Sequence, residues 1–236
     1  MSLAKTTIMK SLNQILISIP AVFIILFPLF APAQVVNESA KKRISIGFGM
    51  FTDIWMNKPE GMKTRNINQG VNVFGTYNIP FGKSNFSFAI GLGINVHNLY
   101  WNYMYDASHD SVQFVKIPDN IGHRRSKLTI PYFEIPMEFR FKTKSKFAVG
   151  VGFKVGTMVY AHSKWIGDDY LFNSTNTLKA SFKGIKNLEK FEYGPTLRIG
   201  YKWFHINGYY ALSNIFVSGT GIDMYPLSIG FVLMPF

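Results

Sequence analysis

The sequence predicts an all-β fold: an eight-stranded antiparallel transmembrane up-and-down β-barrel, preceded by a cleaved signal peptide. Three observations support this prediction. Apolar residues alternate with small or polar ones along most of the chain, which is the period of a strand with two different faces. Short polar turns alternate with long polar connections between these stretches. The longest apolar run stands at the N-terminus behind two lysines, where a secretory signal belongs.

A signal peptide accounts for the first part of the chain. The apolar run of residues 15–30 is followed by Ala-Pro-Ala at 31–33, which is a small-residue cleavage site. We expect residues 1–33 to be removed, so that residues 34–236 form one barrel domain beginning at Gln34. Two prolines interrupt the apolar run and disfavour the alternative of an uncleaved anchor.

Composition and charge narrow the function classes. The chain is 47% hydrophobic and only 16% charged, against about 25% charged residues in soluble proteins. Two of the 25 basic residues fall in the signal peptide, and the remaining 23 still outnumber the 13 acidic residues, which suits an anionic membrane surface. No Lys/Arg-rich arm is present, so we expect no nucleic-acid partner. The lack of cysteine excludes disulfides and thiolate metal sites, and we expect no cofactor.

Eight stretches of the mature chain read as strands. The two clearest are residues 86–97 and 147–162, where Phe, Ile, Leu and Val alternate with Gly, Ala, Asn, Lys and His. The other six are residues 43–55, 69–79, 127–141, 190–203, 204–213 and 226–236.

The connections between these strands have two lengths. Short ones lie near residues 80–85, 142–146 and 203–204, whereas long polar ones cover 56–68, 99–126, 164–189 and 214–225. Short turns at one end and long loops at the other are typical of outer-membrane barrels. All four tryptophans lie at expected strand ends, where aromatic girdles at the two membrane interfaces would place them: Trp55, Trp101, Trp165 and Trp203.

The second face of the strands decides between a membrane barrel and a soluble one. A secreted barrel of the lipocalin type would turn its apolar face inward around a ligand. The second face here combines glycines with charges, as in Gly91, Gly93, Gly150 and Gly152, and a soluble exterior would carry more long polar side chains. A narrow lumen needs this mixture, so we expect the apolar face to contact lipid.

The charged residues of the second face are expected to form a structural network in the lumen. If Phe141 pairs with Phe147, Glu134 meets Lys154, and a buried charge requires such a partner. The expected members are Glu134, Glu138, Arg140, Lys154, Glu192 and Arg198.

Two histidines raise the possibility of an enzyme. His97 and His162 are both expected to project inward near the outer ends of their strands, and some eight-stranded barrels that modify lipid A carry His and Ser at the outer rim. Ser163 follows His162 directly, however, and neighbours on a strand point to opposite faces, so the two cannot act together. We therefore expect no enzymatic activity and no catalytic residue, with a lipid A-modifying enzyme as an alternative.

Four segments carry a resemblance to a known family. "IPYFEIPMEFRF" (130–141), "FAVGVGFKVG" (147–156), "GYYALSNIF" (208–216) and "YPLSIGFVLMPF" (225–236) resemble the PorT-like outer-membrane β-barrel proteins of the Bacteroidetes. The resemblance implies an integral outer-membrane protein, and the member that gives the family its name belongs to the type IX secretion machinery.

A structural or partner-binding role in the cell envelope is the function these observations favour. The expected partners are outer-membrane lipid and lipopolysaccharide, the barrel assembly machinery and, through the resemblance, other envelope or secretion proteins. A small pore or transporter is the main alternative. Eight strands enclose space only for side chains, whereas open channels need about 16.

The final aromatic residue is expected to serve as an assembly signal. Many outer-membrane barrels end in an aromatic on an alternating strand, and Phe236 fits this pattern. Counting back from Phe236 nevertheless selects the weaker apolar set, and Pro235 cannot donate to the ladder, so a bulge there would carry Phe236 to the lipid face.

Deletion of Phe236 should impair assembly in cells more than folding in detergent. We expect the heat-modifiable folded band to be lost from cell membranes, while protein refolded in detergent remains nearly normal. Gel electrophoresis of heated and unheated samples measures both, and a full folded band in cells would exclude the signal.

Overall fold

The computed structural model describes residues 43–105, 114–169, 176–219 and 223–234. The chain divides into two units, Met1–Lys41 and Lys42–Phe236, and the fold described here is that of the second. The expected signal peptide and cleavage site therefore lie outside the described residues. Among the described residues, no helix has the length and apolar character needed to cross a membrane.

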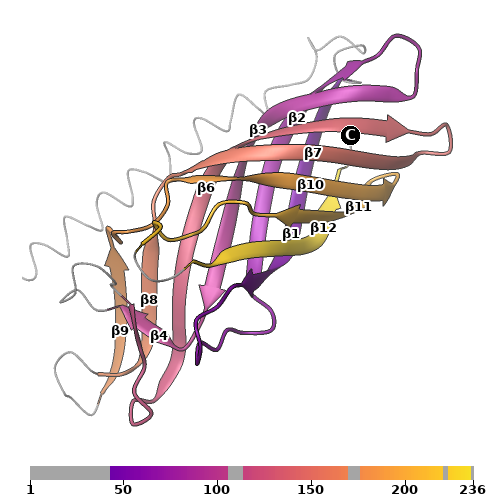
Figure 1. Cartoon of the computed structure of the whole chain (residues 1–236). Helices are drawn as coiled ribbons and strands as arrows, with labels where there is room; N and C mark the ends of the chain where they lie inside the picture. Colours follow the sequence, from indigo (N-terminus) through magenta and orange to yellow (C-terminus); the bar gives the residue numbers. More distant parts are fainter. Residues whose placement is uncertain (1–42, 106–113, 170–175, 220–222, 235–236) are drawn as a thin grey trace, which may run out of the picture. The chain divides into compact units, whose positions relative to one another are not determined.

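Eight strands pair antiparallel in a closed ring, as predicted (Figure 1). Their order around the ring is β3-β2-β1-β12-β11-β10-β7-β6, and β6 pairs back with β3. Every edge of the ring is thereby paired, which is the condition for strands to cross a lipid bilayer. The strands are β1 (Ile44–Met56), β2 (Gln69–Pro80), β3 (Phe86–Tyr100), β6 (His123–Lys142), β7 (Phe147–Met158), β10 (Phe191–Tyr201), β11 (Phe204–Tyr210) and β12 (Tyr225–Leu233).

The apolar face points outward, as the alternation predicts. Leu92 and Ile94 of β3 are each more than half exposed, whereas Asn95 and His97 are buried in the lumen. A surface of exposed Phe, Ile, Leu and Val in a closed barrel is the lipid-facing belt of an outer-membrane protein.

The last strand follows the stronger apolar set. Ile229, Phe231 and Leu233 point outward, and the residues between them face the lumen, where Val232 is 1% exposed. Residues 235–236 lie outside the described residues, so the bulge at Pro235 and the assembly signal stay predictions.

Two of the long connections are not simply loops, which corrects the sequence prediction. They contain β4 (Tyr103–Tyr105), β5 (Phe114–Lys116), β8 (His162–Asp168) and β9 (Thr177–Lys183). The predicted strand 147–162 stops at Met158, is interrupted at residues 159–161, and then continues in the same direction as β8 along the outer half of β6.

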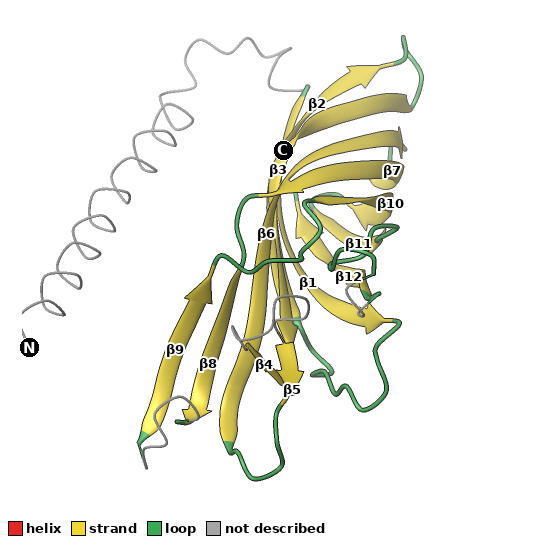
Figure 2. Ribbon diagram, turned by 60° about the vertical axis from the view of Figure 1, so that its left-hand side comes forward, coloured by secondary structure: helices red, strands yellow, loops and turns green. Residues whose placement is uncertain are grey.

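β6 is 20 residues long and makes this arrangement possible. Its inner half pairs with β7 and its outer half with β8, which in turn pairs with β9 (Figure 2). We call β8, β9 and the outer parts of β3 (97–100) and β6 (123–130) the outer extension.

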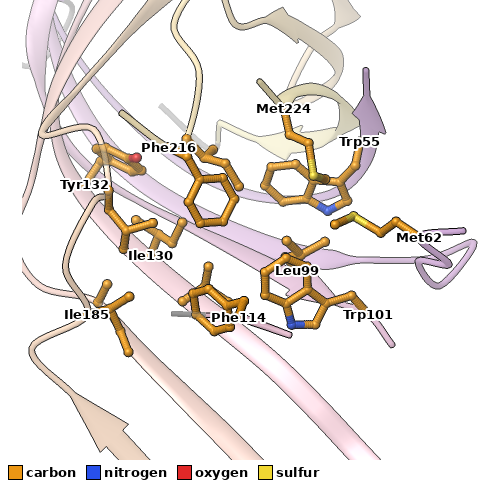
Figure 3. Close-up of a cluster of buried hydrophobic side chains, with 14 residues drawn as sticks. Trp55, Met62, Leu99, Trp101, Phe114, Ile130, Tyr132, Ile185, Phe216 and Met224 are labelled. Atoms are coloured by element: carbon orange, nitrogen blue, oxygen red, sulfur yellow. The ribbon is translucent and has the colours of Figure 1, made fainter. Parts of the chain in front are cut away.

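Three of the four tryptophans do not face lipid, which corrects the girdle prediction. Trp55, Trp101 and Trp165 are at most 4% exposed, and only Trp203 is largely exposed. Trp55 and Trp101 belong to a group of buried apolar side chains that we call the mouth cluster (Figure 3). The alternation does not reveal this, because the long connections fold inward and supply the covering side chains, including Met62, Phe114, Ile185, Leu188, Ile215, Phe216 and Met224.

Phe231→Lys should be severe, because Phe231 lies within the apolar belt between Met50 of β1 and Ile206 of β11. A cation near the bilayer midplane on a lipid-facing position costs about 2 to 4 kcal/mol. Equilibrium unfolding in lipid vesicles measures this loss, with Phe231→Leu as the control that keeps an apolar side chain. Wild-type stability of Phe231→Lys would show that inside and outside are reversed.

Candidate functional site

The predicted charge network lies in the barrel lumen. Glu134, Glu138, Lys154, Glu192 and Arg198 are each at most 8% exposed. The sixth member, Arg140, is half-buried at the short-turn end. Alternation along the strands was sufficient to find all six, because every second residue of a barrel strand faces inward.

The predicted pairing register of β6 and β7 is wrong by two residues. Phe141 lies opposite Val149 rather than Phe147, and Lys154 lies opposite Pro136. The turn sets this register: the Thr143 N–H donates to the Phe147 carbonyl, and Lys146 adopts a positive φ of 69°. The residue types alone do not predict this turn geometry.

Lys154 nevertheless reaches Glu134 diagonally and links two carboxylates. Its Nζ lies 2.8 Å from Glu134 Oε2 and 3.2 Å from Glu192 Oε1. The same Nζ stands 3.8 Å from the centroid of the Tyr209 ring, a cation–π contact. A long side chain can cover one diagonal step across a strand pair, so the ion pair tolerates the shifted register.

His97 joins this network, together with two residues that the sequence analysis did not select. His97 Nδ1 lies 2.8 Å from Asp53 Oδ2, and its Nε2 lies 3.1 Å from Glu192 Oε2. Ser228 donates its hydroxyl to Asp53 Oδ1 at 2.6 Å. The alternation of inward and outward positions along the strands could have identified Asp53 and Ser228, because both occupy inward positions.

A second ion-pair group lies toward the short-turn end of the lumen. Glu138 Oε2 lies 3.1 Å from Arg198 Nη1 and 3.4 Å from Arg140 Nη2. The Arg198 guanidinium also stands 4.7 Å from the centroid of the Phe74 ring. Both cations therefore share one carboxylate and are supported by other lumen side chains.

In the two ion-pair groups, around Lys154 and around Glu138, the positive and negative charges are nearly equal in number. The carboxylates of Asp53, Glu134, Glu138 and Glu192 contact Lys154, Arg140, Arg198 and His97. An imidazolium at His97 donates from both ring nitrogens and makes the balance complete. The Asn95 amide lies 2.7 Å from Nε2, and turning it by 180° presents its oxygen as a further acceptor.

A small cavity lies between these side chains. A cavity of about 30 Å³ lies among Phe74, Glu134, Lys154, Asn207 and Tyr209. This volume accommodates only a few water molecules, since one water requires about 10 to 15 Å³. The side chains around this cavity hold charges and order the barrel wall, and the cavity itself is too small for a solute.

The two histidines are not brought together. His97 is buried in the lumen, whereas His162 lies opposite Thr129 on the outward face of the outer extension. The inward orientation predicted for His162 is therefore wrong, because His162 begins β8 instead of ending β7. Ser163 points inward and Ser228 bonds to Asp53, so neither hydroxyl is presented to a histidine nitrogen.

Metal-binding groups are absent from the part of the chain that the structure describes, where no three His, Asp or Glu side chains are placed to hold an ion. Asp53 and Glu192 approach opposite nitrogens of the His97 ring and thus act as its hydrogen-bond partners.

Lys154→Met should leave Glu134 and Glu192 without their shared cation. Breaking a buried ion pair costs about 3 to 5 kcal/mol. Adding Glu134→Gln should recover part of this loss, with the remainder due to Glu192. A double-mutant cycle of unfolding free energies in detergent measures the coupling, and Lys144→Met in an exposed short turn is the matched control. Purely additive losses would show that Lys154 and Glu134 are uncoupled.

Comparisons with known proteins concern the fold. No curated protein sequence matches the chain. Two solved structures of Ail, the attachment invasion locus protein of Yersinia pestis, are similar at 13% sequence identity, and each comparison covers 81% of this chain and 97% of Ail. The TM-score is 0.39 for Ail in complex with the heparin analogue sucrose octasulfate and 0.38 for Ail alone. A family model of the outer membrane protein β-barrel domain matches residues 33–217, and the chain belongs to this family.

Proposed function

We propose that this integral outer-membrane barrel is a non-enzymatic structural and partner-binding component of the cell envelope. The observation that carries the proposal is the obstruction of the barrel at two levels. Ion pairs around Lys154 and Glu138 occupy the lumen, and the mouth cluster lies above them. A barrel filled in this way anchors a surface in the membrane and offers no path for solutes.

The outer extension is the surface that such an anchor would present. β9 pairs with β8 on one side, and no strand among the described residues pairs with its other edge. The extension is attached to the barrel through backbone pairing, because β8 pairs with the outer half of β6. A platform of this kind suits binding to another envelope protein.

The absence of catalysis is part of the proposal. It is supported by the positions of His97 and His162 on opposite sides of the barrel wall and by the engagement of both His97 nitrogens with carboxylates. A base that already binds two carboxylates has no free nitrogen with which to activate a nucleophile.

A link to protein secretion is supported by the resemblance of segments such as residues 130–141 and 225–236 to the PorT-like proteins of the Bacteroidetes. Purification of the native protein in mild detergent tests this link. Recovery of secretion-machinery components with the wild type, but not with a variant lacking β8 and β9, is the expected result.

The purified protein should form no large, stable single channels in planar bilayers. The reason is the filled lumen, whose cavity of about 30 Å³ is lined by charged, polar and aromatic side chains. A known open porin recorded under the same conditions is the control for insertion and sensitivity. Stepwise currents comparable to those of the porin would favour the pore alternative.

A further inference from the structure

Basic side chains gather on the outward face of the outer extension. They lie on β6, β8 and β9, and we call them the cationic stripe: Arg125, Lys127, His162, Lys164 and Lys183. Lys127 is directly opposite Lys164, and these two are like charges. His162 is directly opposite Lys183, and burial and the charges of Lys127, Lys183 and Lys164 lower its pKa, which favours the neutral imidazole. Like charges in directly opposed positions destabilise a sheet, so this arrangement calls for an explanation other than stability.

The stripe has no anionic partner within the described residues. None of its members forms an ion pair with a described carboxylate. Asp168 shares the face but lies at the far end of β8, where it accepts the Gly122 N–H at 2.6 Å. Burial and the charges of Arg125 and Lys164 lower the pKa of Lys127, the direction expected of crowded cations.

A basic pocket continues the stripe on the side of β3. Its volume is about 210 Å³, and Lys63, Arg65, Tyr100, Arg124 and Arg125 are among its lining residues. The Arg65 guanidinium stands 4.4 Å from the Tyr100 ring centroid, and Lys127 Nζ stands 5.6 Å from the same centroid. Tyr100 therefore joins the pocket to the stripe.

The pocket is held in place by backbone hydrogen bonds. The Arg65 N–H donates to the Tyr100 carbonyl at 3.0 Å, and the Lys63 N–H donates to Asn102 Oδ1 at 2.7 Å. The Asn102 N–H donates back to the Lys63 carbonyl at 3.1 Å. The backbone that carries the two cations of this loop is thus fixed against the end of β3.

The position of the cationic stripe along the strands indicates which part of the membrane it contacts. Along the outward face of β3 and β6, the apolar pair Val96–Pro131 is followed by Asn98–Thr129 and then by Tyr100–Lys127. Lys127 is four residues beyond Pro131, about 13 Å along the strand and less along the membrane normal because barrel strands tilt. The cations therefore lie just beyond the apolar, lipid-facing surface along these strands, at the level of the lipid headgroups.

We propose that the cationic stripe and the basic pocket bind the phosphates of an anionic lipid headgroup in the outer leaflet. Arg and Lys bind phosphate oxygens through charge-assisted hydrogen bonds, and an aromatic ring at this depth suits the interface. A lipid is favoured over a soluble phosphate because the stripe continues the apolar belt, so acyl chains and headgroup are contacted by one surface. The proposal rests on the proposed membrane role and names its lipid partner.

Binding to diphosphoryl lipid A in neutral detergent tests the proposal. Native mass spectrometry counts bound lipid, and the shift of the unfolding temperature with added lipid reports binding to the folded state. Lys127→Gln/Lys164→Gln should weaken binding roughly tenfold or more, since each cation near an anionic surface contributes measurably. Lys83→Gln/Lys144→Gln, in the short turns of the opposite end, is the matched control and should change binding less than about twofold.

A second variant and a soluble competitor complete the test. Lys63→Gln/Arg65→Gln should weaken binding independently, which keeps the proposal testable if the first variant does not fold. Equal lipid binding by wild type and a folded stripe variant overturns the proposal. Glucosamine 1-phosphate that binds as tightly as the lipid overturns the lipid assignment in favour of a soluble ligand. If one of these two results is obtained while planar bilayers show no channel currents, the lipid-binding proposal fails and the proposed function of a filled barrel stands.

Discussion

The pairing of β1 with β12 is the constraint on which the rest of the structure depends. It extends from Phe48 opposite Leu233 to Met56 opposite Tyr225 and joins the first strand of the ring to the last. In a bilayer, each unpaired backbone N–H or C=O costs several kcal/mol, because no water is present to replace the missing partner. Closure therefore turns one face of every strand toward lipid and encloses the other.

An enclosed face of eight strands has little room, and this limits what the lumen can contain. Where side chains are charged, each requires a counter-charge within hydrogen-bond distance, and the contacts of Lys154 and Glu138 meet this requirement. Where the backbones of two neighbouring strands approach closely, no side chain fits between them. A Cβ at Gly230 would lie 2.1 Å from the Met50 carbonyl oxygen. Charge balance and close approach are thus two results of the same narrow geometry.

The outer end of the barrel is not subject to this constraint, because water can form hydrogen bonds with its polar groups. β6 continues beyond β7 and pairs with β8 instead, so the sheet extends past the ring with one edge left at β9. The mouth cluster covers the inner side of this end, while the outward side carries cations. The barrel thereby separates a charge-balanced interior from a charged outer surface next to the lipid-facing belt.

The sequence by itself determined the closed eight-stranded class, the lipid-facing side and the six charged lumen residues, because a period of two is imposed locally on every strand. It did not determine the partners of those charges. The two-residue shift between β6 and β7 depends on the turn around Lys146, and the hydrogen bonds of His97 and Asp53 together join residues from four strands of the ring. Nor did it reveal that Trp55 and Trp101 are buried in the mouth cluster, since loops distant in sequence cover them. Only the tertiary structure decided these features, because they depend on which strands and loops become neighbours once the ring closes.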